Sequence, residues 1–588
     1  MGFDNNWNLK DIYETKKDWE LECEALELKL NENQKYIGKL NISSKNLANC
    51  LNWYEETLVL FEKIYGYASL NNFRSSLDSI SQELMSKISL IENEVNTATA
   101  FIEPEILNID ENILKDYINS NAKLEKYRVY IDEIIRFKPH ILNKNEEELL
   151  GLVASVATSP ARIYNTFVNS DIKYPDILDK IGNKHKLSAT NYISYMVSED
   201  EVLRKNAFFG IYNTLKTYEN TFFSMISGNI NKVMLYKNSR KYNSSLSKAM
   251  FADNLPVEIY ENVISEVNKK LPILYKYYGI KKKLLNLEKF HIYDVYTKLP
   301  YDLDIDATYD NAKNVVKEAL LPLGEEYIVL VDMVFNNSWI DVYENTGKRS
   351  GACVLNIYSV HPYMLLNHTN KFNDITVIAH EMGHAIHSYK SSKKQSYLNS
   401  NYKIFIAEIV STVNECLLSE YLINTSKTKE EKIIYLTDYI EKIKSTIFRQ
   451  TMFAEFEKII YEKVENKEVL STKILNEVYY DLNKKYFGEN VELNQEIEIE
   501  WARIPHFYNE YYVYKYASGM CAALNIVSSI LSGDKEVLKE YLLLLEKGCS
   551  EYPLELLQKV KVDFNTSKPF EMALNMFEAK VDELEKLI

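Results

Sequence analysis

The sequence predicts a mostly helical protein with a small β-structure, and three observations support this fold class. Apolar residues recur at helical spacing in many segments, among them residues 18–40. No proline occurs between Pro362 and Pro505. Because proline removes an amide donor and clashes with the preceding turn, this stretch permits several long helices. Few Gly and Pro residues accompany 46% hydrophobic and 26% charged residues, which is typical of a globular protein. In residues 18–40 the recurring leucines are Leu21, Leu26, Leu28 and Leu30.

The length, charge and cysteines limit the class of protein. A chain of 588 residues exceeds one ordinary core, so we expect two or more lobes or one large helical assembly. A formal net charge of -15 without a long Lys/Arg block argues against nucleic-acid binding. The six cysteines are scattered without paired spacing, which favours a reducing compartment.

Neither a secretion signal nor a membrane segment is predicted. The first residues lack a cationic stretch followed by an apolar one, and no segment reaches the roughly 18 apolar residues of a membrane span. We therefore expect a cytoplasmic protein with no membrane partner.

One stretch departs from the helical pattern. Residues 340–342 form a short alternating run, residues 345–347 read Asn-Thr-Gly, and a second run extends over 352–358. An Asn/Gly turn between two alternating runs predicts a β-hairpin just before the most histidine-rich segment. The hairpin is either a small structural element or part of a binding site.

That segment, residues 377–389, reads VIAHEMGHAIHSY. Asn373 or Asp374 can cap a helix that starts before Ile375. His380 and His384 are then about 6 Å apart along the axis and share a face, which suits two imidazoles that bind one tetrahedral zinc ion.

This is the HExxH arrangement, in which Glu381 can reach a metal-bound water without being a ligand. The surrounding residues are apolar, and an unpaired His or Glu is costly to bury among them. The alternative is a pair of hydrogen-bonded core histidines with a surface glutamate. Ligands at 380, 384 and 387 would spread too far along the helix to meet at one ion, so His387 is predicted to be a packing or supporting residue.

The third ligand must come from another element. Glu408 lies among Phe405, Ile406, Ala407, Ile409 and Val410, where a carboxylate is unfavourable unless a cation compensates it. It is the best candidate. Glu415 falls on the same helical face and either supports the site by hydrogen bonding or is an ordinary surface residue.

A second dense patch, residues 501–519, reads WARIPHFYNEYYVYKYASG. The plain interpretation is an aromatic core helix. A zinc peptidase, however, needs donors directed at the oxyanion that it creates, and imidazole and phenol groups supply them. Together with the HExxH motif, the patch predicts such donors for some of its residues, and Tyr511 and Tyr514, three apart, could share a face.

Several motifs together resemble the thimet oligopeptidase family of zinc metallopeptidases, and within it the oligoendopeptidase F group. The resemblance extends more loosely to nearly the whole chain. The motifs that carry it are ENTGKRSGA (344–352), HPYMLLN (361–367), AHEMGHAIHSY (379–389), EIVSTVNE (408–415) and IPHFYNEYYVYKYASG (504–519).

The resemblance implies an almost entirely helical, two-lobed fold with a deep substrate channel, and hydrolysis of short peptides. We expect an N-terminal helical lobe at 1–195 and a catalytic region at 196–588. The segment after Gly351 departs from the small-residue-rich sequence expected there, since Cys353, Val354 and Leu355 occupy it.

Motif by motif, the resemblance assigns roles to residues of this chain. His380, His384 and Glu408 would bind one zinc ion, and Glu381 would be the general base. His506 and tyrosines of its patch would face the substrate, with Tyr511 as the first choice and Tyr514 as the second.

The expected reaction is hydrolysis of an internal peptide bond, with Glu381 taking a proton from the attacking water and passing it to the leaving amine. Gly351 and Ala352 would bind the peptide backbone along a strand edge. The alternatives are a helical peptide-binding protein that keeps a structural metal, and another HExxH hydrolase such as an aminopeptidase. The sequence leaves the oligomeric state open.

Overall fold

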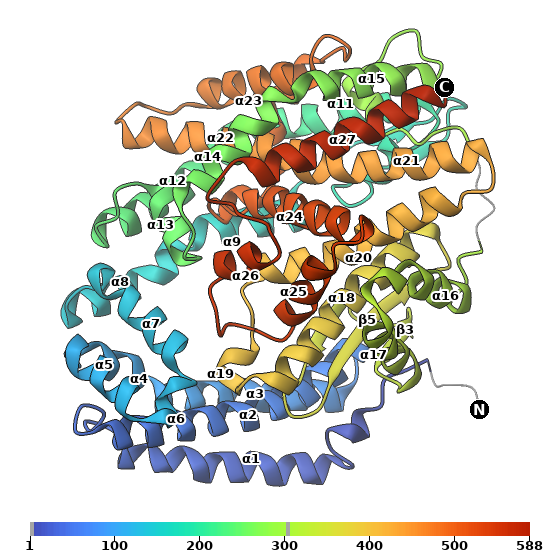
Figure 1. Ribbon diagram of the computed structural model, residues 1–588. Helices are drawn as coiled ribbons and strands as arrows, with labels where there is room; N and C mark the ends of the chain where they lie inside the picture. The colour runs from blue at the N-terminus through green and yellow to red at the C-terminus, as the bar shows by residue number, and fades with distance from the viewer. Residues whose placement is uncertain (1–4, 302–305) are drawn as a thin grey trace. The chain divides into compact units, whose positions relative to one another are not determined.

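The computed structural model describes residues 5–301 and 306–588. It is 71% helical, and its strands form one two-stranded and one three-stranded sheet (Figure 1). The predicted mostly helical fold class is confirmed. The long stretch without proline contains five long helices, as expected: α18 (Phe372–Lys394), α20 (Ile404–Thr425), α21 (Lys429–Ile443), α22 (Arg449–Glu465) and α23 (Thr472–Phe487).

The chain folds into two compact units whose segments alternate along the sequence. The first comprises Met1–Pro139, Asp304–Leu422 and Ala523–Val562, and the second comprises His140–Leu303, Ile423–Ala522 and Asp563–Ile588. This division differs from the predicted boundary between residues 195 and 196, which stays a prediction. Two helices, α20 and α24 (Tyr514–Leu531), continue from one unit into the other.

The first unit contains the metal-site motifs and the three-stranded sheet. Besides α18 and most of α20, its helices are α1 (Lys16–Leu30), α2 (Ser44–Arg74), α3 (Ser79–Thr99), α4 (Ile102–Leu107), α5 (Glu111–Ser120), α6 (Ala122–Glu125), α7 (Arg128–Arg136), α16 (Tyr309–Ala319), α17 (Glu325–Asn336), α19 (Tyr397–Ser400), α25 (Lys535–Leu544) and α26 (Pro553–Lys559). Its strands are β3 (Ile340–Tyr343), β4 (Cys353–Asn356) and β5 (Pro362–His368).

The second unit contains the aromatic patch and a small antiparallel sheet of β1 (Asp176–Leu178) and β2 (Lys184–Lys186). Besides α21, α22 and α23, its helices are α8 (Lys144–Ala157), α9 (Ser159–Thr166), α10 (Tyr192–Met196), α11 (Glu201–Thr217), α12 (Glu219–Ser239), α13 (Ser245–Ala252), α14 (Val257–Lys269), α15 (Leu271–Leu284) and α27 (Lys568–Lys586). Short 3₁₀ helices cover Gln495–Arg503 and Pro505–Tyr508, and π-helical turns cover Phe167–Asp171 and Lys444–Phe448.

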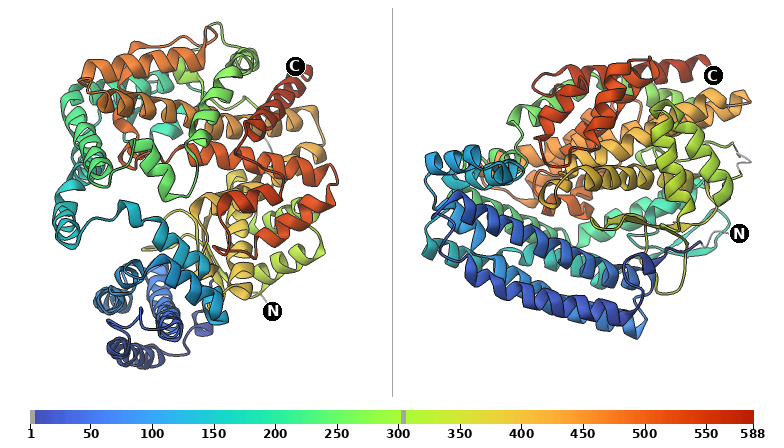
Figure 2. Two further views of the ribbon diagram at one scale, coloured as in Figure 1. Left: turned by 60° about the vertical axis from the view of Figure 1, so that its left-hand side comes forward. Right: turned by 60° about the horizontal axis from the view of Figure 1, so that its bottom comes forward.

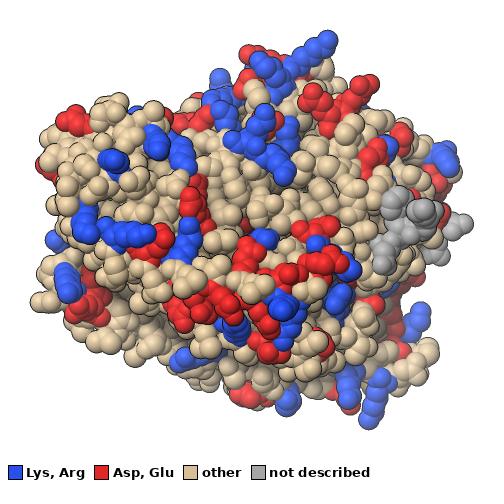
Figure 3. Space-filling view, turned by 90° about the horizontal axis from the view of Figure 1, so that it is seen from below, with Lys and Arg blue, Asp and Glu red and all other residues tan. Residues whose placement is uncertain are grey.

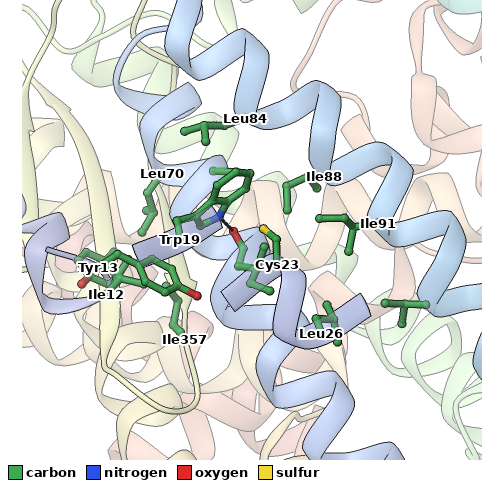
Figure 4. Close-up of a cluster of buried hydrophobic side chains, with 14 of the residues drawn as sticks. Ile12, Tyr13, Trp19, Cys23, Leu26, Leu70, Leu84, Ile88, Ile91 and Ile357 are labelled. Carbon is green, nitrogen blue, oxygen red and sulfur yellow. Dashed lines mark hydrogen bonds between the residues drawn. The ribbon is translucent and has the colours of Figure 1, made fainter. Parts of the chain in front are cut away.

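In the first unit, α1, α2 and α3 pack side by side around a core that Figure 4 shows (Figures 1, 2 and 4). Trp19 fixes α1 to α2 in this core. Its ring is buried, and its indole N–H donates to the carbonyl of Ile64 at 3.0 Å. The buried face of α1 is Trp19, Cys23, Leu26 and Leu30. The expected leucine face is therefore wrong in part, since Leu21 and Leu28 are exposed; Trp19 and Cys23 occupy the helical spacing instead.

The three-stranded sheet has the order β3-β5-β4. β5 pairs parallel with β3 and antiparallel with β4, so β3 and β4 are not hydrogen-bonded neighbours. The predicted hairpin between residues 340 and 358 is wrong, because the apolar β5 inserts between the two runs. Burial of β5, whose first five residues are buried, places it at the centre of the sheet.

The sheet rests on α2 with one face and meets α18 with the other. Ile357, directly after β4, is fully buried against Gly66 of α2, where a Cβ would lie 2.5 Å from the isoleucine Cδ1. On the other face, the Asn356 amide donates to Ser392 Oγ of α18 at 2.9 Å. The sheet thereby holds α18 along its length.

Helix α18 begins at Phe372, three residues before Ile375. Asp374 does not precede the helix, as the sequence suggests for a cap, but lies in its first turn. There its Oδ2 accepts from the backbone amides of Thr369 and Lys371 at 2.6 and 3.0 Å. A carboxylate in the first turn is stabilised by the amide dipoles of the helix.

No helix in residues 5–301 and 306–588 combines the length and apolar character that a bilayer crossing demands. On the face drawn in Figure 3, basic and acidic side chains are interspersed.

Candidate metal centre

A glycine allows α18 and α20 to approach closely. A Cβ on Gly383 would lie 2.7 Å from Ser411 Cα, so any larger residue would push the two backbones apart. Asn414 of α20 fixes the register, because its amide donates to the carbonyl of Ala379 at 3.1 Å and its oxygen accepts from Tyr327 at 3.2 Å. The HExxH helix is thus tied to both α20 and α17.

The close approach brings together the three predicted ligands. His380, His384 and Glu408 each offer one ligand atom, and these atoms lie within 4.8 Å of one another. The two imidazole Nε2 atoms are 3.1 Å apart, and the rings are nearly perpendicular. Two histidines one helical turn apart and a carboxylate from another helix form a suitable donor set for a divalent transition metal.

Glu415 fixes the orientation of one of these imidazoles. Its carboxylate accepts from His380 Nδ1 at 2.6 Å, which leaves the Nε2 lone pair directed toward His384 and Glu408. Burial alone would lower the pKa of His380, but the hydrogen bond and charge of Glu415 outweigh it and raise the pKa above its ordinary value. Of the two interpretations left open for Glu415, the structure favours the supporting role.

Glu381 is buried next to these groups. Its side chain is 6% exposed, and Oε2 has no hydrogen-bond partner among the described residues. Burial and the nearby carboxylates outweigh the attraction of His380 and raise the pKa of Glu381 to about 7. Burial likewise raises the pKa of Glu408. Several acidic groups in one buried space are unfavourable unless a cation offsets their charge.

His387 lies outside this cluster. It is fully buried and stacks on Tyr402 with ring centroids 3.6 Å apart and planes 9° from parallel. This agrees with the packing role predicted from its position on the helix.

The predicted aromatic residues occupy the second unit. His506 is half-buried, and its ring has Tyr512 and Tyr516 as neighbours, with centroids at 6.3 and 5.8 Å. Burial lowers the pKa of His506, so the neutral imidazole is favoured.

Tyr511 and Tyr514 instead point into the core of that unit. The Tyr511 hydroxyl bonds Ser245 Oγ at 2.8 Å, and its backbone amide donates to the buried Glu457 at 2.7 Å with φ at +53°. The Tyr514 hydroxyl donates to Asp253 at 3.4 Å. Both phenols are therefore engaged within their own unit.

Gly351 and Ala352 lie directly before β4, an outer strand of its sheet. Gly351 has φ at +81°, a conformation that favours glycine, and its carbonyl accepts from the Asn367 amide at 2.7 Å. Within the described residues β4 pairs only with β5, so its other edge faces no strand.

Sequence reasoning missed two residues that build this site, Gly383 and Asn414, and also Tyr402, which packs on His387 outside the metal cluster. The glycine inside an otherwise helical motif was a usable signal, since glycine in a helix interior is unfavourable unless close packing requires it. Asn414 acts through contacts between helices, and Tyr402 acts from the segment between α19 and α20 by stacking on α18. The sequence gives no local signal for either contact.

The fold and the site together define a class: a helical protein in which an HExxH helix is crossed by a carboxylate-bearing helix, as in metal-dependent peptidases. The comparisons with known proteins identify the family within this class. Residues 194–576 match the model of Peptidase family M3, and residues 105–174 match the model described as Oligopeptidase F. The chain belongs to Peptidase family M3 and is a peptidase.

The chain is similar to known oligopeptidases over most of their length. The chain is 39% identical to Oligopeptidase PepF of Bacillus subtilis, over 100% of this chain and 87% of that protein. It is 34% identical to Group B oligopeptidase PepB of Streptococcus agalactiae, over 99% and 97% of the two chains. The crystal structure of oligoendopeptidase-F from Enterococcus faecium matches with a TM-score of 0.75 and 31% identity, over 97% of this chain and 99% of that one.

Proposed function

We propose that this chain is a zinc-dependent oligoendopeptidase that hydrolyses internal bonds of short peptides. The observation that carries the proposal is the convergence of His380, His384 and Glu408 in a member of Peptidase family M3. The names of the relatives, an oligopeptidase and an oligoendopeptidase, support short peptides as the substrate class.

Zinc fits the donor set. Two imidazole nitrogens and one carboxylate oxygen are the ligands of many catalytic zinc sites, which keep a further position for water or substrate. Glu415 supports this assignment, because the outer nitrogen of a zinc-bound histidine usually donates to a carboxylate. When bound, the metal would acidify a water molecule and polarise the scissile carbonyl.

Glu381 is the proposed general base. It neighbours His380 on the helix, and its Oε2 has no competing hydrogen bond in the described residues. Its raised pKa, about 7, suits a group that must both accept and release a proton near neutral pH. Glu381 would take a proton from the attacking water and deliver it to the amine of the leaving peptide.

The β4 edge and the aromatic patch are proposed to hold the substrate. Gly351 and Ala352 would pair with the peptide backbone, which gives hydrogen bonds independent of the substrate side chains. His506 is the proposed oxyanion donor. Tyr511 and Tyr514 remain proposed donors, although each would have to release its present partner, Ser245 or Asp253, to reach a substrate.

The decisive variant is Glu381→Gln. It removes the base but keeps the shape of the side chain, so cleavage of a quenched oligopeptide should fall by about 10²- to 10⁴-fold while bound zinc stays at the wild-type level. Glu430→Gln, on an exposed residue of α21, is the matched control and should match the wild type in both measurements. Near-normal turnover by Glu381→Gln would refute the base assignment.

A chelator separates this peptidase from a peptide-binding protein with a structural metal. Hydrolysis should stop when a chelator removes the metal and return when zinc is added. Mass spectrometry of the products should show cuts inside the peptide and not the stepwise loss of terminal residues. Stepwise loss would identify an exopeptidase instead.

A further inference from the structure

A recess of the first unit lies beside the metal cluster. Its volume is about 400 Å³, within the range of small-ligand pockets. Loop residues before β4, the end of β5 and the first turns of α18 line it. The lining residues that matter here are Ala352, Leu366, His368, Asn373, Val377 and Ile378.

One edge of the recess, at Asn373 and Val377, is on the metal-facing side of α18. Asn373, Val377, His380 and His384 follow one another at spacings of four, three and four residues, so they share one helix face. Val377 is about 4.5 Å along the axis from His380, on the N-terminal side. A substrate held at the metal cluster would therefore pass a side chain over Val377.

The floor of the recess is apolar. Leu366 and Ile378 are each 1% exposed and close its base, and Val377 and Ala352 form walls. A buried apolar floor favours an apolar side chain, because water leaves both surfaces on binding.

Most of the polar side chains in the lining are already engaged within the chain. The Asp374 carboxylate accepts from Thr369 and Lys371, and the Asn367 amide donates to Gly351 and Arg349. In the same wall, His368 Nε2 bonds the carbonyl of Ala307 at 3.0 Å, and its Nδ1 lies 3.7 Å from Asp374. His368 Nδ1 makes no hydrogen bond, and the exposed Lys371 also lines the recess. Apart from these two groups, the polar side chains described here are already paired within the chain.

The direction of the substrate follows from how β4 lies along α18. Gly351 and Ala352 share the recess with Val377, whereas Asn356 at the other end of β4 bonds Ser392. β4 therefore runs in the same direction as α18, and the recess lies at the beginning of both. A peptide added antiparallel to β4, the slightly more stable pairing, would run toward the recess in its N-to-C direction.

We propose that this recess is a specificity pocket that binds an apolar side chain of leucine to phenylalanine size, on the carboxyl side of the cleaved bond. The proposal rests on the proposed peptidase function and adds the substrate preference of that site. Val377, at its wall, would be the residue that sets the permitted size.

The test uses quenched peptides that differ only at the residue after the cleaved bond: Gly, Ala, Leu, Phe, Asp or Lys. The wild type should prefer Leu and Phe over Ala, Asp and Lys in kcat/KM. Val377→Phe fills the recess and should lower the Leu-to-Ala ratio of kcat/KM by at least about 10-fold. Val329→Phe, on a valine of α17 that is 65% exposed, is the matched control and should keep the wild-type ratio.

Val377→Ala provides the complementary measurement. It enlarges the recess and should shift preference toward Phe, which keeps the test valid if Val377→Phe does not fold. Three outcomes would contradict the proposed specificity pocket. They are unchanged ratios in both variants, a wild-type preference for Asp or Lys, and a preference set only by the residue before the cut. If the wild type cleaves none of the peptides with zinc present, the proposed function itself fails, and the pocket with it.

Discussion

His387 differs from the other two histidines of α18 in what surrounds its ring nitrogens. Neither nitrogen has a hydrogen-bond partner among the described residues, and the ring is fully buried against Tyr402. Burial and the neighbouring His384 lower the pKa of His387 from 6.5 to about 3. The neutral imidazole of His387 therefore packs like an aromatic ring, but its two nitrogens are buried without a hydrogen bond.

His387→Phe should leave stability near neutral pH unchanged or slightly higher, because it removes polar atoms that make no bond. His140→Phe is the matched control: His140 also stacks on a tyrosine, Tyr242 at 3.7 Å, but its Nδ1 bonds the Arg240 carbonyl at 2.8 Å. We expect that control to lose about 0.5–1.5 kcal/mol. Denaturant unfolding of both variants measures the difference.

We also expect His387→Phe to change how folding stability depends on pH. Because the folded pKa of His387 is depressed, its neutral form contributes stability above pH 6.5 that is lost as pH falls toward about 3. Between those values His387→Phe should lose less stability than the wild type. Parallel losses in the two proteins would show that another group governs this range.

At the scale of elements, the crossing of α18 and α20 decides whether the carboxylate of Glu408 reaches the two imidazoles. The crossing depends on Gly383, where no Cβ separates the backbones. Most of the ligand geometry is local to α18, but the third ligand is positioned by this one contact between helices.

Gly383→Ala should therefore weaken both packing and metal affinity. Its Cβ would meet Ser411 Cα at 2.7 Å, so the helices must separate and Glu408 must move from the histidines. The same change at Gly151, in α8 with nothing within 4 Å of its Cβ, should instead stabilise by about 0.5–1 kcal/mol. Zinc titration and thermal melting of both variants test this contrast. Wild-type zinc affinity in Gly383→Ala would show that the crossing does not position Glu408.

At the scale of the whole molecule, ligand binding to one unit adds to the stability of the fold. The cluster joins α18 to α20 within the first unit, and a bound ion would hold them together. An ion that binds only the folded state stabilises it by about 2.7 kcal/mol at a concentration of 100 Kd.

Zinc should raise the thermal transition of the wild type, and a chelator should reverse the increase. His384→Ala removes a ligand and should abolish the shift. His185→Ala, on β2 of the second unit, should keep it. A zinc-dependent shift of equal size in His384→Ala would place the stabilising ion elsewhere.

The sequence predicted what depends on neighbours along the chain. His380 and His384 share a face because a helix repeats about every 3.6 residues, and this needs no tertiary information. The length of the helices followed from the same local rules and from the absence of proline. Glu408 was found because a carboxylate among apolar residues requires compensation, which is again readable from its neighbours.

Only the tertiary structure decided which separate segments meet. It placed β5 between β3 and β4 where a hairpin was predicted, since burial of an apolar strand outweighed the local turn signal. It also showed that Glu415 hydrogen-bonds His380. Tyr511 bonds Ser245, and Tyr514 bonds Asp253. These outcomes depend on packing between residues far apart in the chain, and local spacing carries no information about it.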